Sequence, residues 1–178
     1  MTDRAGVDAD IRPLMGGFPS GVSVVTALDA DGRPWGMTCT SLASVALSPP
    51  TLVVCLRTGS PTTAGVLRSG QLALNLLHEG AQEVSDLFAS GDPRRFARCE
   101  WRLPLGAGGP HLTRAAHAVA DCAVVGTREV GDHTAVFVRV RGFTCEESVQ
   151  PLLYGRRRYG SWSRAVAVVR EGVGHVGS

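Results

Sequence analysis

Lysine is absent from this sequence, because all 18 basic residues among its 178 are arginine. A chain without lysine forms no Schiff base with pyridoxal phosphate and cannot build a P-loop, which needs a lysine for the nucleotide phosphates. The 16 acidic residues nearly balance the arginines and leave a net charge of +2. That charge is too small to favour binding to nucleic acid or to a membrane surface.

Long apolar runs and paired cysteine motifs are also missing. No run approaches the roughly 18 consecutive apolar residues of a membrane span, and the opening MTDRAGVDADIRP lacks the pattern of a secretory signal. We therefore expect a cytoplasmic protein. The five cysteines are widely spaced without a C-x-x-C pair, and the five histidines show no ligand spacing. We expect no metal site.

Residues 172–177 (GVGHVG) match the dinucleotide-binding pattern G-x-G-x-x-G. That pattern works only between a strand and a helix whose N-terminus holds the pyrophosphate. Only Ser178 follows it here, so we interpret residues 164–178 as a flexible tail. The remaining chain is predicted to comprise an N-terminal segment, residues 1–16, and one folded domain, residues 17–163.

Short β-like runs dominate the chain, separated by 22 glycines and 10 prolines. Such runs occupy residues 21–28 (GVSVVTAL), 51–56 (TLVVCL) and 71–77 (QLALNLL). Residues 119–130 and 133–143 face each other across Gly131-Asp132, which predicts a hairpin. The alternating runs suit half-buried strands, and the continuous run at 51–56 suits a buried one.

Helical patterns are fewer and shorter. Ser60 followed by Pro61 predicts a helix that begins there and ends at Gly70. Residues 80–93 (GAQEVSDLFASGDP) predict a second helix from their apolar residues at three- and four-residue spacing. Many antiparallel strands with few short helices indicate a closed or split β-barrel rather than a βαβ sheet.

Hydroxyl groups are concentrated in residues 36–63, where ten of 28 residues are serine or threonine. Hydroxyls and loop amides bind phosphate well because each donates a hydrogen bond without the burial of a full cation. Arg57 and the helix start at Ser60-Pro61 add positive charge and a helix dipole to the same region. Serine and threonine also cap helices and turns, so the residues alone leave phosphate binding and capping both open.

The chain resembles the flavin reductase family, which supplies reduced flavin to two-component monooxygenases. The resemblance rests on FPSGVSVVTALDADGRPWGMTCTSLASVALSPPTLVVCL, SGQLALNLL, LFASGDPRRF, GDHTAVFVRV and LLYGRRRYG, in the family's order from Phe18 to about Trp162. It implies a mainly β fold with short helices, a split β-barrel of the FMN-binding type that forms homodimers. It also implies FMN or FAD held without a covalent bond, and NADH or NADPH as reductant.

The resemblance places the flavin site on three segments. The first segment contains Thr38, Cys39, Thr40, Ser41 and Ser44. The second is a loop that would bind the phosphate, and it contains Cys55, Leu56, Arg57, Thr58, Gly59, Ser60 and Thr62. The third contains Phe88, Ala89 and Phe96. His133 corresponds to the position near the nicotinamide. Tyr159 and Arg156 would close that side.

The implied activity is hydride transfer from NAD(P)H to flavin N5, after which reduced flavin leaves for a partner monooxygenase. One alternative is a flavin-dependent oxidase that resembles pyridoxamine-phosphate oxidases, for which residues 156–158 would supply basic groups. The other is a flavin-binding sensor on the same scaffold, since fold does not fix function. The sequence leaves open the choice between FMN and FAD and between NADH and NADPH.

Overall fold

The computed structural model describes residues 10–164, which form two β-sheets and a few short helices. None of the helices in this span is long and apolar enough to cross a membrane. Apart from Arg164, the predicted flexible tail and its residues 172–177 lie outside the described part of the chain.

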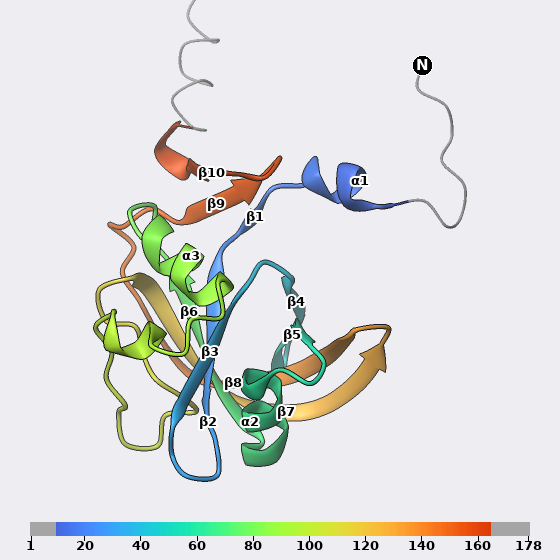
Figure 1. Ribbon diagram of the computed structural model, residues 1–178, viewed down its shortest axis with the longest axis vertical. Coiled ribbons are helices and arrows are strands. Elements are labelled where there is room, and N and C mark those ends of the chain that lie inside the picture. The colour runs from blue at the N-terminus through green and yellow to red at the C-terminus, as the bar shows by residue number, and fades with distance from the viewer. Residues whose placement is uncertain (1–9, 165–178) are drawn as a thin grey trace, which may run out of the picture.

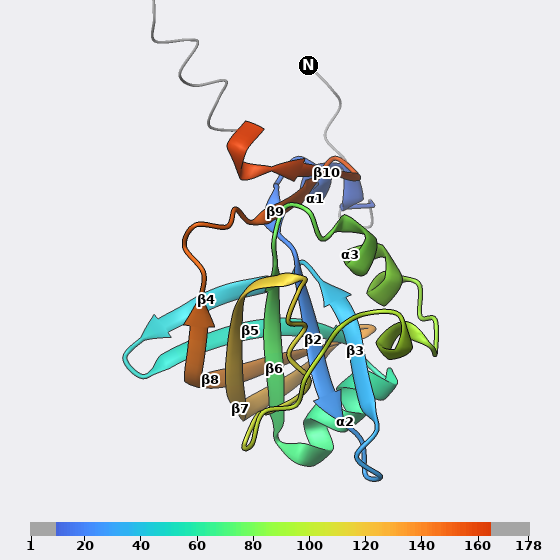
Figure 2. The same cartoon turned by 90° about the vertical axis from the view of Figure 1, so that its left-hand side faces the viewer.

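The large sheet has seven antiparallel strands in the order β3–β2–β6–β7–β8–β5–β4. Their bounds are β2 Ser23–Leu28, β3 Pro34–Cys39, β4 Leu42–Leu47, β5 Pro50–Arg57, β6 Gln71–Leu77, β7 Ala116–Val130 and β8 His133–Cys145. Register shifts interrupt the β7–β8 ladder twice and the β4–β5 ladder once. Because such bulges bend a strand and increase its twist, the sheet curls strongly (Figures 1 and 2).

The curled sheet is split rather than closed. Its edge strands β3 and β4 are not paired with each other, although Cys39 at the end of β3 comes within 3.7 Å of the Cys55 carbonyl on β5. Thr40 and Ser41 alone connect β3 to β4, so the chain itself crosses the split. The mainly β, split-barrel fold predicted from the sequence is confirmed.

A small sheet and α3 cover one end of the split barrel. The small sheet has the order β1–β9–β10, with β1 Ser20–Gly21, β9 Leu152–Gly155 and β10 Arg158–Ser161. The helices are α1 Arg12–Gly16, α2 Pro61–Ser69 and α3 Gln82–Ala89, with a 3₁₀ turn at Arg95–Ala97. Figure 2 shows α3 beside the small sheet and α2 at the opposite end of the large sheet.

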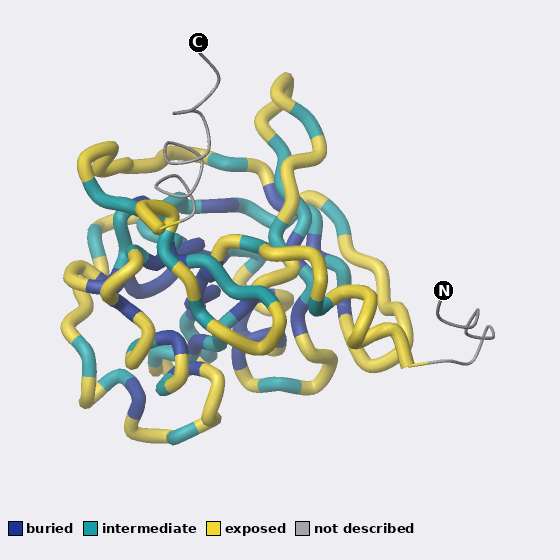
Figure 3. Tube along the Cα trace, turned by 90° about the horizontal axis from the view of Figure 1, so that it is seen from above, coloured by how far each residue is buried: buried dark blue, intermediate teal, exposed yellow. Residues whose placement is uncertain are grey.

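Two apolar clusters hold these layers together. The first fills the curled sheet with side chains such as Val54, Leu56 and Val136, all fully buried. The second joins the large sheet to α3 and the small sheet through residues such as Phe88 and Leu152. Figure 3 shows the buried segments grouped inside the fold and the exposed ones on the connecting loops.

The predicted elements agree with the structure with one refinement. The strands at 51–56 and 71–77 and the hairpin across Gly131-Asp132 are present. The helix at Ser60 is capped by the Ser60 side chain and ends at Gly70, whose φ of 67° suits glycine. The run at 21–28 divides at Val22, where the chain passes from the small sheet into the large one.

Candidate active site

The crossing between β3 and β4 brings two predicted segments together. The Ser41 hydroxyl donates to the Cys55 carbonyl at 2.9 Å, and the Cys55 amide lies 3.4 Å from the Ser41 carbonyl. The Cys39 sulfur lies 3.1 Å from the Ser41 hydroxyl. Burial raises the pKa of the Cys39 thiol, so this thiol is neutral and packs as part of the core. Thr40 is exposed at the crossing.

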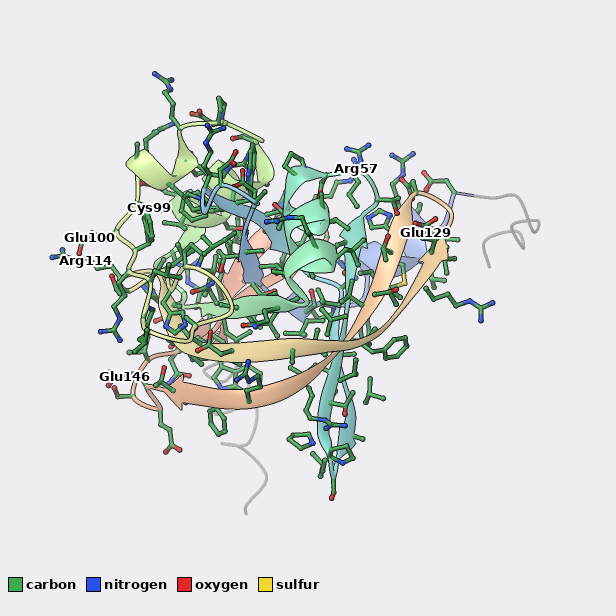
Figure 4. All side chains as sticks on the ribbon, turned by 90° about the horizontal axis from the view of Figure 1, so that it is seen from below. Arg57, Cys99, Glu100, Arg114, Glu129 and Glu146 are labelled. Atoms are coloured by element: carbon green, nitrogen blue, oxygen red, sulfur yellow. The ribbon has the colours of Figure 1, made fainter. Side chains whose placement is uncertain are left out.

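The loop after β5 is held by the turn between β7 and β8. The Thr58 amide donates to the Asp132 carbonyl at 3.0 Å, and the Thr58 and Thr134 hydroxyls are 2.9 Å apart. Arg57 pairs with His133 across the β5–β8 ladder. In Figure 4, Arg57 lies at the same end of the molecule as Glu129, which is near the end of β7 and precedes this turn. The structure thus unites the predicted phosphate loop with the predicted nicotinamide residue.

The start of α2 provides donors at this loop. Ser60 accepts from the Thr63 amide at 3.1 Å. Thr62 is the second residue of α2, and the amides of a first helical turn have no acceptor inside the helix. Gly59 has a φ of 77°, a left-handed conformation that glycine adopts readily. Arg57 is exposed beside these groups. The donor set of hydroxyl, amide, helix terminus and arginine fits a phosphate group.

A second group of predicted residues lines a cavity of about 390 Å³ beside the same crossing. The lining comprises Val22, Thr38, Thr40, Ser85, Asp86, Ala89, Tyr154, Arg157 and Tyr159. The Thr38 hydroxyl donates to the Ser85 carbonyl at 2.6 Å. The Tyr159 hydroxyl donates to Asp86 Oδ1 at 2.7 Å and lies 2.9 Å from the Ser85 hydroxyl. These bonds fasten α3 to β3 on one side and to β10 on the other.

Several predicted residues lie in the core. Leu56, Thr62 and Phe88 are each 2% exposed or less. Phe88 packs edge-on against Phe96, with ring centroids 5.1 Å apart, and both rings lie over Gly36. Their role in the structure is to set the distance between α3 and β3, and hence the width of the cavity.

Two predicted residues stand apart from both groups. Ser44 is exposed on β4 beside the bulge. Arg156 is exposed in the turn between β9 and β10, where its amide donates to the Gly16 carbonyl at 2.7 Å. Its neighbour Arg157 lines the cavity instead.

The hydroxyl groups of residues 36–63 serve the fold as well as the site. Thr38, Ser41, Thr58 and Ser60 each make a hydrogen bond within the protein. Capping and packing therefore account for part of the hydroxyl content, as the sequence left open. The Thr63 hydroxyl donates to the Arg57 carbonyl, so in the 2.9 Å contact between the Ser60 and Thr63 hydroxyls the proton comes from Ser60. The Ser60 hydroxyl therefore serves the fold as both acceptor and donor.

Sequence reasoning missed five residues that line the cavity: Val22, Ser85, Asp86, Tyr154 and Arg157. Ser85 and Asp86 belong to α3, the helix whose apolar residues drew attention to Phe88. Arg157 is one of three consecutive arginines, and nothing in the sequence indicates which of them faces the cavity. Among residues 10–164, no three histidine, cysteine or acidic side chains are grouped so as to hold a metal ion.

Several known proteins are similar to this chain. The family model described as "Flavin reductase like domain" matches residues 15–163. Flavin reductase (NADPH) of Lentzea aerocolonigenes is 43% identical over 164 residues, covering 90% of this chain and 95% of that protein. The reductase subunit HsaB of a flavin-dependent monooxygenase from Rhodococcus jostii is 36% identical, covering 83% of this chain and 74% of that protein.

A solved structure is similar as well. The NADH:FAD oxidoreductase SgcE6 of Streptomyces globisporus, in complex with NAD and FAD fragments, has a TM-score of 0.78 and 29% identity, covering 84% of this chain and 89% of that one. The family model spans nearly all of the described residues, and the relatives match over most of their length. The chain belongs to the flavin reductase family.

Proposed function

We propose that this protein is an NAD(P)H-dependent flavin reductase that reduces FMN or FAD and releases it in reduced form. The observation that carries the proposal is the crossing of the split barrel at Thr40 and Ser41. There the loop after β5, whose groups fit a phosphate, adjoins the cavity beside α3. Two adjoining subsites suit a reaction between two nucleotides. The names of the relatives support the activity, since both NADPH- and NADH-dependent flavin reductases are among them.

The loop from Cys55 to Thr62 would bind the phosphate of the flavin. Arg57 contributes charge, and the first turn of α2, with the Thr62 amide, contributes helix-terminal donors. One arginine with several neutral donors holds phosphate less firmly than an arginine clamp would. Moderate affinity suits a protein that must release its product to a partner monooxygenase, the role that the name of HsaB indicates for that relative.

His133 would position the nicotinamide. Its backbone pairs with Arg57 in the β5–β8 ladder, and its Nδ1 is 2.8 Å from Asp132 Oδ1, so the ring orientation is fixed by its neighbour Asp132. The flavin supplies the hydride-accepting chemistry when bound, and the protein supplies orientation. No side-chain acid or base is required at the reacting carbon, which fits a residue whose task is placement.

A single assay tests the proposed activity. Purified protein is mixed with NADH or NADPH and free FMN or FAD, and the absorbance of the reduced nucleotide is followed. We expect many turnovers for each protein molecule. Oxidation limited to one equivalent, or none, would support the flavin-binding sensor or the oxidase instead.

His133→Ala tests the positioning role. We expect a rise in the KM for NAD(P)H that exceeds any loss of flavin affinity, because the ring contacts the nicotinamide side. Glu147→Gln, at an exposed loop residue outside both subsites, is the control. Equal losses of affinity for NAD(P)H and for flavin would contradict the role of His133 in positioning the nicotinamide.

We also propose that the protein is a homodimer in the cytoplasm, as the resemblance and the sequence predicted. Exposed apolar side chains on β4, β7 and β8 support the dimer: Val45, Leu47, Val125, Val130 and Phe143 are each at least 51% exposed. The β4–β5 hairpin also projects from the rest of the sheet (Figure 2). Light scattering should give twice the chain mass, and Leu47→Asp should shift the protein toward monomer.

A further inference from the structure

The cavity between α3 and the small sheet contains one cation, the side chain of Arg157. Its volume of about 390 Å³ lies within the usual range for small-molecule sites. The other lining residues are neutral except Asp86. Thr38, Thr40 and Ala89 are among the residues that the resemblance placed in the flavin site, and Tyr159 is one that it placed on the nicotinamide side, so the cavity lies where the two nucleotides would meet. Arg157 itself was not among the predicted residues.

The backbone of the turn directs Arg157 toward this cavity. Gly155 and Arg158 pair directly, so Arg156 and Arg157 form a two-residue hairpin turn. Their φ angles are 50° and 59°, and a turn with both central residues at positive φ ordinarily contains asparagine and glycine. Side chains with a Cβ atom are disfavoured there. Such a local conflict between sequence and structure is typical of functional positions.

The two arginines of the turn have different tasks. The Arg156 amide donates to the Gly16 carbonyl and so attaches the turn to the end of α1. That bond explains why the turn keeps its conformation without asparagine or glycine. Arg157 makes no ion pair with a carboxylate within residues 10–164. Its guanidinium is therefore available to a ligand in the cavity.

Two carboxylates lie near Arg157, and each has another partner. Asp86, on the opposite wall, accepts a hydrogen bond from the Tyr159 hydroxyl at 2.7 Å. Asp10 is paired with Arg12 at 2.8 Å; that hydrogen bond is the main cause of its lowered pKa, and the charge of Arg157 adds a smaller contribution. Tyr159 and Tyr154 complete the polar groups on this side.

A reaction between two nucleotides needs two places for phosphate. The loop at Arg57 and Ser60 provides the first, next to the start of α2. We propose that Arg157 provides the second, and that it binds a phosphate of the pyridine nucleotide, either the diphosphate or the 2′-phosphate of NADPH. The inference rests on the proposed function, which supplies the identity of the second nucleotide. It assigns to Arg157 the role that the sequence suggested for Arg156.

The test compares Arg157→Gln and Arg57→Gln with the wild-type protein. Isothermal titration measures the affinity for NADH, NADPH and FMN separately, each without the other nucleotide, and steady-state kinetics measures each KM. Arg157→Gln should weaken pyridine-nucleotide binding about tenfold or more, as expected for the loss of a charge-assisted hydrogen bond, and leave FMN affinity within about twofold. Arg57→Gln should show the opposite pattern.

Two further variants separate charge from fold. Arg157→Lys should recover much of the lost affinity because it restores the positive charge. Arg158→Gln removes an exposed arginine from the same hairpin and should leave every affinity unchanged. Thermal unfolding of each variant checks that the hairpin remains folded.

The outcomes separate the two sources of phosphate. If Arg157→Gln loses affinity for NADH and NADPH alike, Arg157 contacts the diphosphate. If it loses affinity for NADPH alone, Arg157 contacts the 2′-phosphate. Both results support the proposal. A loss for FMN with intact pyridine-nucleotide binding would overturn it, as would wild-type behaviour of Arg157→Gln or a loss confined to Arg156→Gln. If the wild type fails to oxidise NAD(P)H with flavin, the proposed function fails, and the titrations still decide the role of Arg157.

Discussion

The loop after β5 and the cavity beside α3 share the crossing at Thr40 and Ser41, but they are built in different ways. The loop belongs to the large sheet: its Thr58 amide bonds the turn between β7 and β8, and its last residues begin α2. The cavity is enclosed by α3, by the end of β3 and by the small sheet. Side-chain bonds, such as those of Thr38 and Tyr159, hold its walls together.

This difference predicts how each subsite responds to substitution. Elements with fewer shared backbone bonds open locally at lower free energy, so the cavity should adapt more than the loop. A loop fixed to the sheet keeps its donors in place whether or not a ligand is bound. We therefore expect changes in α3 and the small sheet to alter pyridine-nucleotide affinity more than flavin affinity.

Gly36→Ala should have the largest effect on stability and binding, and that effect should be greatest at the cavity. A Cβ atom at Gly36 would lie 2.8 Å from Phe88 Cε1, and Phe88 is 1% exposed and packed against Phe96. The ring has no space to yield, so α3 must move away from β3. We expect a loss of about 1–3 kcal/mol in the free energy of unfolding, with a larger rise in the KM for NAD(P)H than in the Kd for FMN.

Gly126→Ala is the matched control, because a Cβ atom at that strand glycine meets nothing within 4 Å. Chemical denaturation should find it as stable as the wild type or more so. If Gly36→Ala were equally stable, the packing of α3 on β3 would be looser than the structure shows. If Gly36→Ala weakened the binding of FMN more than that of NAD(P)H, the distinction between the two subsites would be wrong.

Ser60→Ala should have a smaller effect, on the loop side. It removes the cap of α2, where Ser60 accepts from the Thr63 amide, and a lost cap costs about 1 kcal/mol of stability. We expect weaker binding of FMN but little change for riboflavin, since the affected donors lie where the phosphate would bind. Fluorescence quenching of each flavin on titration with protein measures both affinities.

Ser69→Ala serves as the comparison at the other end of the same helix. Ser69 is exposed, and its hydroxyl donates to the Gln71 carbonyl and accepts from the Gln71 amide, so the substitution also removes hydrogen bonds but lies away from the loop. Both flavins should bind this variant as they bind the wild type. Equal weakening of FMN and riboflavin in Ser60→Ala would show that the cap acts through helix stability alone.

Tyr159→Phe should slightly weaken the binding of NAD(P)H at the cavity. The lost hydroxyl donates to Asp86 at 2.7 Å, and a hydrogen bond of this kind contributes about 0.5–1.5 kcal/mol. Without it Asp86 faces the cavity as a free carboxylate and repels the phosphate near Arg157. The KM for NAD(P)H should rise a few fold while the Kd for FMN stays constant. A rise in both values would contradict the assignment of Tyr159 to the pyridine-nucleotide side.

The sequence predicted the loop side of the site better than the cavity side. Ser60, Pro61 and Gly70 define α2 through local capping rules, and the hairpin around Gly131-Asp132 follows from strand alternation. Such signals lie within a few residues of one another. The relation between Arg57 and His133 needs only the pairing of two predicted strands, together with the resemblance.

The cavity could not be predicted because it depends on contacts between distant segments. Strands β9 and β10 have four residues each, too few for a periodic pattern, and two arginines occupy a turn that usually contains asparagine and glycine. Thr38 contacts Ser85, 47 residues away, and no local rule connects them. Which arginine of residues 156–158 faces the cavity is settled by the turn geometry alone.

The smallest expected effect concerns acid at the loop side. The hydrogen bond from His133 is the main cause of the lowered pKa of Asp132. A carboxylate with a lowered folded pKa adds stability above its unfolded pKa of about 3.9, and that stability is lost as the pH falls through the folded value. Asp132 is exposed, so the effect on unfolding is slight, and NMR titration of its side chain is the suitable measurement.

His133→Ala should move the pKa of Asp132 upward, toward that of a free aspartate. An unchanged value would mean that the two side chains do not bond in solution, and the orientation of the His133 ring would then lack its fixed neighbour. The cavity side behaves differently, because burial, with the bond to Asp86, raises the pKa of Tyr159. Its phenol therefore stays neutral throughout the working range, so Tyr159 itself brings no change of charge to the cavity there.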